Sequence, residues 1–64
     1  MTDRYRVTVT VGGRPMLHGW WSAEAVARAK FSSWVGEHGD QPGARVTLTD
    51  EANGSVLTEW PDPG

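Results

Sequence analysis

The chain carries the stretch YRVTVTVGG at residues 5–13, and this stretch decides the fold. Tyr5 and three valines alternate with Arg6 and two threonines. This period of two predicts a β-strand with one buried face. Gly12 and Gly13 both tolerate positive φ, which a tight hairpin turn requires. A second strand is therefore expected over residues 16–21, antiparallel to the first.

The register of this first hairpin is open at the level of sequence. A two-residue turn places Met16 opposite Val9, and a three-residue turn places Leu17 there. That one-residue slip exchanges the two faces of the second strand. Since successive side chains of a strand point to opposite faces, Trp20 and Trp21 diverge in either register. One of these two tryptophans is expected to lie off the core.

A helix is expected over residues 23–38. Ser22 is placed to accept hydrogen bonds from the first turn as an N-cap, and Glu24 suits the positive end of the helix dipole. Gly39 is the expected C-cap, with Gly36 as the alternative. At helical spacing, one face of this helix carries Ala23, Ala27, Phe31, Trp34, Val35 and His38.

The second half of the chain repeats the hairpin pattern. Residues 45–49 alternate again and predict a third strand, and Ser55–Trp60 predicts a fourth. Between them, residues 50–54 form the expected turn, with Asn53 and Gly54 in left-handed conformations. The expected fold is α+β, in the order ββαββ: two β-hairpins forming an antiparallel sheet with one helix on one face. The strand order stays open.

The helix can cover only one face of such a sheet. The expected core beneath it comprises Tyr5, Val7, Val9, Val46, Leu48 and Trp60, in contact with Ala27, Phe31, Trp34 and Val35. The opposite face is expected to show Arg4, Arg6, Thr8, Thr10, Arg45, Thr47, Thr49 and one tryptophan of the adjacent pair.

Length and composition bound the functional classes. The chain has 64 residues, no cysteine and a net charge of −2. We expect one small domain over residues 1–60 and a flexible tail over residues 61–64. Neither a disulfide nor a thiolate metal site is available. No apolar run approaches the length of a membrane span, so a cytoplasmic location is expected, without membrane or small-molecule partners.

No pattern in the sequence indicates catalysis, a cofactor or a metal. His18 has no nearby carboxylate in sequence, and His38 with Asp40 offers too few ligands to specify a metal. Gly12-Gly13-Arg14 joins two strands, whereas a phosphate loop joins a strand to a helix. We therefore expect no catalytic, cofactor-binding or metal-binding residues, and a protein that is not an enzyme.

Four segments resemble a group of short uncharacterised proteins from actinobacteria and their plasmids or phages. These segments are Tyr5–Val11, His18-Gly19-Trp20-Trp21, residues 31–39 and Ala44–Asp50. The resemblance implies a bacterial, intracellular setting. It implies no activity and no site residues.

The uncovered sheet face is the expected functional surface, since tryptophan and arginine are enriched where proteins bind one another. The residues expected at the contact are Arg4, Arg6, Trp20, Trp21 and Arg45. The expected function is a small protein-interaction module that binds itself as a homodimer, or another protein, through this face or an edge strand. The alternatives are a nucleic-acid-binding regulator using the same face, and a small inhibitor or adaptor of a mobile element.

Overall fold

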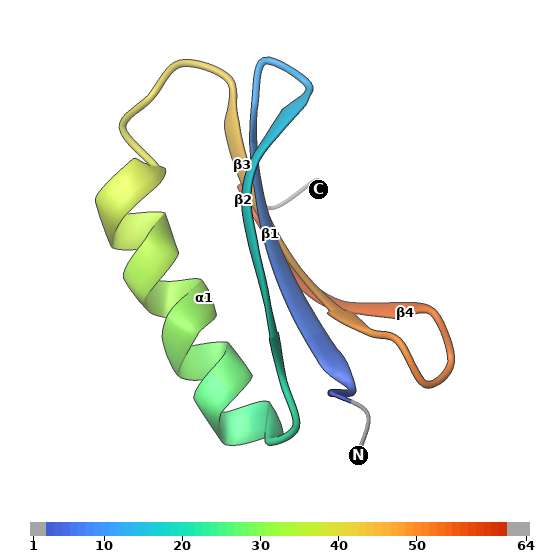
Figure 1. The fold of residues 1–64 in the computed structure, drawn as a ribbon. Coiled ribbons are helices and arrows are strands. Elements are labelled where there is room, and N and C mark those ends of the chain that lie inside the picture. Colours follow the sequence, from blue (N-terminus) through green and yellow to red (C-terminus); the bar gives the residue numbers. More distant parts are fainter. Residues whose placement is uncertain (1–2, 62–64) are drawn as a thin grey trace.

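The computed structural model describes residues 3–61 and confirms the α+β fold in the order ββαββ (Figure 1). Its elements are β1 Tyr5–Val11, β2 Arg14–Trp21, α1 Glu24–His38, β3 Ala44–Asp50 and β4 Ser55–Trp60. The bounds of β4 match the prediction, while β2 and β3 are longer than expected. Residues 62–64 of the expected tail lie outside the described residues.

The four strands form one antiparallel sheet in the order β2-β1-β3-β4. The two valine–threonine strands, β1 and β3, lie at the centre, and β2 and β4 are the edges. α1 packs mainly over β1 and β3, on one side of the sheet that we call the covered face (Figure 1). No helix or strand of residues 3–61 covers the other side, the open face. The open face carries Arg6, Thr8, Thr10, His18, Trp20, Arg45, Thr47, Thr49, Val56 and Glu59.

The core lies between α1 and the covered face, as predicted, but the prediction of Trp60 within it is wrong: Trp60 pairs with Val46 at the edge of the sheet and its ring lies beside Gly39. Its fully buried side chains come from the central strands and one helical alanine: Val7, Val9, Val46, Leu48 and Ala27. Tyr5 is buried beside them, and Trp21, Phe31, Trp34, Val35 and Leu57 pack around them. Strict alternation in β1 and β3 produces this core because every second side chain points to α1.

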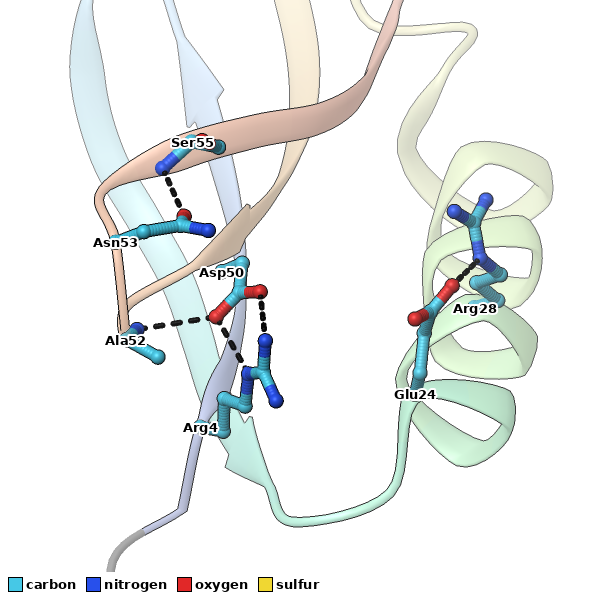
Figure 2. A network of polar contacts seen from close by, with 7 residues as sticks. All are labelled: Arg4, Glu24, Arg28, Asp50, Ala52, Asn53 and Ser55. Atoms are coloured by element: carbon cyan, nitrogen blue, oxygen red, sulfur yellow. Dashed lines mark hydrogen bonds and ion pairs between the residues drawn. The ribbon is translucent and has the colours of Figure 1, made fainter.

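The helix begins one residue later than predicted and is capped differently. Ala23 occupies the N-cap position and makes no side-chain cap hydrogen bond, so the prediction of Ser22 as the N-cap is wrong. The first turn is tied instead by Glu24, whose carboxylate accepts a hydrogen bond from Arg28 at 2.6 Å (Figure 2). Gly39 is the C-cap, as predicted. A Cβ there would meet the backbone carbonyl oxygen of Val35 and lie 2.9 Å from the Trp60 ring, so close packing accounts for this glycine.

The first hairpin contains a β-bulge that neither predicted register included. Gly12 and Gly13 have φ of 60° and 82°, and they form the two-residue turn. Beyond the turn, Thr10 pairs with Pro15 but Val9 pairs with Leu17, which leaves Met16 as the extra residue. The two-residue turn is therefore correct, but the pairing expected from it, with Met16 opposite Val9, is wrong. From Leu17 onwards, the side chains of β2 point to the faces that the three-residue turn predicted.

The second hairpin turns through residues 51–54 under the control of Asp50. The Asp50 carbonyl accepts a hydrogen bond from the Gly54 N–H at 2.8 Å, and its carboxylate accepts one from the Ala52 N–H at 3.0 Å. Asn53 accepts from the Ser55 N–H at 2.9 Å (Figure 2). Within this turn, only Gly54 has positive φ, at 74°, so the prediction of a left-handed Asn53 is wrong. The side-chain bonds of Asp50 and Asn53 hold the turn without it.

No helix within residues 3–61 is long and apolar enough to cross a membrane. The cytoplasmic location stays a prediction.

Candidate interaction surface

The bulge decides which tryptophan lies off the core. Trp20 pairs with Arg6 on the open face and is 43% exposed. Trp21 pairs with Tyr5 on the covered face and is half-buried. Its ring meets Trp34 edge to face, with centroids 5.7 Å apart. Of the two tryptophans expected at a contact surface, only Trp20 therefore belongs to the open face, and Trp21 belongs to the rim of the core.

Arg6 links the exposed tryptophan to the rest of the open face. Its guanidinium lies over the Trp20 ring, 5.5 Å from the centroid, a cation–π arrangement. It also donates to Thr8 Oγ1 at 3.2 Å and to Glu51 Oε1 at 3.3 Å. These bonds hold the cation against one face of the indole and leave the rest of the ring open to a partner.

Glutamates accompany both arginines of the open face. Arg45 lies 3.3 Å from Glu59 of the neighbouring strand β4, as Arg6 lies 3.3 Å from Glu51. The four charges sum to zero, so the face offers no net positive field to a phosphate backbone. The sequence did not predict these two ion pairs, because Glu59 reaches Arg45 only through the β3–β4 pairing and Glu51 lies in a turn.

Arg4 does not lie with these residues, and its predicted place on the uncovered face is wrong. Its Nε and Nη2 donate to the two carboxylate oxygens of Asp50, each at 2.8 Å (Figure 2). Asp50 is buried and pairs with Tyr5 on the covered face. Strand alternation does not extend to Arg4 because β1 begins at Tyr5. The hydrogen bond from Arg4 lowers the pKa of Asp50 below its usual value, and burial opposes this shift.

Strand β2 forms an exposed edge of the sheet. Met16 is 63% exposed and Leu17 is 37% exposed. No charged residue lies between Arg14 and the end of the strand, although proteins commonly protect such edges with charge. The opposite edge, β4, carries Glu59. We use the term β2 surface for the exposed side chains of this edge and the adjoining arginine: Arg6, Met16, Leu17, His18 and Trp20.

Within residues 3–61, no group of three or more histidine, aspartate or glutamate side chains is arranged to hold a metal ion. His18 lies opposite Thr8 on the open face. His38 lies 3.4 Å from Gln41 and 3.9 Å from Glu37 at the end of α1. A surface hollow of about 360 Å³ is lined by Asp3, Arg4, Glu51 and Ala52. That the chain is not an enzyme stays a prediction.

Comparison of the chain with protein-family models, with curated proteins and with solved structures gives no match. The resemblance to short actinobacterial proteins stays a prediction.

Proposed function

We propose that this chain is a small, non-enzymatic protein-interaction module that binds a second copy of itself through the β2 surface. One observation carries the proposal: from Pro15 to Trp21, the sheet edge β2 carries no Asp, Glu, Lys or Arg, and Met16, Leu17 and Trp20 are exposed along it. An edge strand of this kind presents unpaired backbone groups to any strand that can align with it. Because no Asp, Glu, Lys or Arg lies between Pro15 and Trp21, two copies of this stretch meet without like-charge repulsion between their paired side chains.

The exposed tryptophan supplies a large part of the expected affinity. Trp20 is 43% exposed. Covering that part of the indole, on the order of 100 Å², contributes roughly 2 kcal/mol to association. Leu17 and Met16 add further apolar area beside it. Stable interfaces bury ~1,600 Å² in total, and a contact along one short edge is smaller. We therefore expect a weak homodimer.

A nucleic-acid regulator has less support than the sequence indicated. That alternative relied on Arg4, Arg6 and Arg45 standing together on one face. Arg4 is instead bonded to Asp50, and the other two each lie beside a glutamate. An adaptor for a foreign protein would use the same edge, and it becomes an outcome of the test.

Sedimentation equilibrium up to hundreds of micromolar tests the proposal. We expect reversible dimerisation of the natural chain. Trp20→Ala should weaken it by at least ~10-fold, since roughly 1.4 kcal/mol corresponds to a factor of ten. Val56→Ala is the matched control, because Val56 is 57% exposed on the open face at the other edge. We expect it to dimerise like the natural chain.

Two results would overturn the proposal. The first is a natural chain that stays monomeric throughout the concentration range, which would redirect attention to a foreign partner. The second is equal weakening by Trp20→Ala and Val56→Ala. Fluorescence titration with a single-stranded oligonucleotide covers the nucleic-acid alternative, which requires binding that falls steeply with salt.

A further inference from the structure

The hydrogen bonds at the two ends of the β1–β3 ladder fix the direction of every backbone group in the sheet. The Gly12 N–H donates to the Gly43 carbonyl at 3.2 Å, and the Glu51 N–H donates to the Arg4 carbonyl at 2.8 Å. In an antiparallel pair, a residue directs its N–H and C=O to the same neighbour, and successive residues alternate. The even-numbered residues of β1 therefore bond to β3, and its odd-numbered residues bond to β2.

This alternation identifies the free backbone groups of β2. Gly19 lies opposite Val7, and Trp21 lies opposite Tyr5. Val7 and Tyr5 are odd-numbered residues of β1, so the backbone groups of Gly19 and Trp21 bond to β1. His18 and Trp20 lie between them and direct their N–H and C=O groups away from the sheet. Earlier in the strand, the bulge interrupts the ladder and Pro15 has no N–H to offer. The open edge of β2 is thus a short stretch with outward groups at His18 and Trp20.

We propose that two copies pair β2 to β2, antiparallel, about a two-fold axis at Gly19, so that their sheets join into one. This inference rests on the proposed function and specifies the register of that self-association. The axis is perpendicular to the sheet, so both helices lie on the same side. α1 packs mainly over β1 and β3 and less over the edge strand β2.

The register follows from the outward groups. Residues that lie opposite each other on antiparallel strands point to the same face of the sheet, whereas successive residues of one strand point to opposite faces. A two-fold axis between two successive residues would place these two residues opposite each other. The axis must therefore pass through a residue. With the axis at Gly19, His18 of each copy lies opposite Trp20 of the other, and all outward groups of these residues are bonded. An axis at His18 would place Trp20 opposite the bulge residue Met16. An axis at Trp20 would place His18 opposite Ser22, which lies beyond the end of β2.

The same register covers two exposed apolar side chains of the edge, Trp20 and Leu17. On the open face, the Trp20 indole lies beside the His18 ring of the second copy. On the covered face, Leu17, which is 37% exposed, lies opposite Trp21 of the second copy. Each copy therefore extends the rim of its partner's core.

Cross-linking of single-cysteine variants tests the register, and the chain has no cysteine of its own. His18→Cys and Trp20→Cys are prepared separately and oxidised alone or mixed. Opposed residues in a hydrogen-bonded pair have Cα atoms ~5.5 Å apart, within disulfide range. Only the mixture should then cross-link, at least ~10-fold faster than either variant alone, because the pairing raises the effective concentration of the two thiols. Val56→Cys is the control for random collision.

Proline substitutions give a second readout that keeps Trp20 in place. His18→Pro removes one outward N–H from β2. Val56→Pro does the same on β4, because Val56 lies opposite Thr49, which bonds to β1. Both variants should keep the far-UV circular dichroism of the natural chain. His18→Pro should lose dimerisation by sedimentation, and Val56→Pro should keep it.

The outcomes separate the register from the function. Efficient cross-linking of His18→Cys alone, or of Trp20→Cys alone, would place the axis elsewhere and overturn the register while self-association through β2 stands. The register would also be overturned by a dimer that Trp20→Ala weakens and His18→Pro leaves intact. A natural chain that is monomeric at every concentration overturns both proposals.

Discussion

Replacing Gly19 with alanine tests whether Trp21 is wedged between β2 and α1. A Cβ at Gly19 would lie 2.8 Å from Cζ3 of Trp21 and closer still to Cη2, distances that real side chains do not adopt. The indole must therefore move, and this movement disturbs its edge-to-face contact with Trp34. The variant reports directly on this packing.

The expected loss combines three effects of different sign. Disturbing the Trp21–Trp34 pair costs about 0.5–1.5 kcal/mol. Forcing extra volume into a packed site costs about 1–3 kcal/mol. Replacing a strand glycine with alanine stabilises the folded chain by about 0.5–1 kcal/mol. The net is a destabilisation of about 2 kcal/mol, which corresponds to a fall in Tm of about 10 °C for a chain of this size.

Urea unfolding followed by far-UV circular dichroism measures this loss, and near-UV circular dichroism reports on the paired indoles. Gly36→Ala is the matched control, because a Cβ at Gly36 meets no atom within 4 Å. It lies inside α1, so alanine should stabilise the chain by about 1 kcal/mol. Both are measured at two protein concentrations, since association raises apparent stability. Gly19→Ala unfolding at the same or a higher urea concentration than the natural chain would refute the wedge.

Two further predictions concern the core and the Arg4–Asp50 ion pair. Leu48→Ala removes a fully buried side chain, costs about 2–5 kcal/mol, and should leave much of the chain unfolded at 25 °C by circular dichroism. Asp50→Asn addresses pH: the pKa of Asp50 is lowered in the folded state, so its stabilisation is present above the unfolded pKa and is lost as pH falls through the folded pKa. Thermal unfolding at pH 7 and pH 3 should show a smaller acid-induced fall in Tm for Asp50→Asn, and equal falls would contradict the role of Arg4.

The sequence predicted the fold where the burial pattern is simple. β1 and β3 are buried on one face only, so their alternation identified the core side chains directly. The pair Gly12-Gly13 indicated the first turn, because no other residue adopts positive φ as readily as glycine. The strand order was beyond reach, since the β1–β3 pairing joins residues about forty positions apart and leaves no local signal.

The candidate site was only partly predictable for a different reason. The five residues expected at the contact divide into Arg6, Trp20 and Arg45 on the open face and Arg4 and Trp21 off it. Arg4 was misplaced because alternation was extended beyond the end of a strand. Trp20 and Trp21 could not be separated, because the turn alone does not reveal a bulge.

The bulge at Met16 connects the core to the proposed interface. Without the extra residue, the pairing continued from the turn would bring Trp20 under α1 and leave Trp21 on the open face. The outward backbone groups would shift by one residue as well. With the bulge, Trp21 contacts Trp34 between the sheet and α1. Trp20 then lies at the edge, where its own N–H and C=O groups point away from the sheet. A single unpaired residue thus sets both which tryptophan stabilises the monomer and which one remains for a partner.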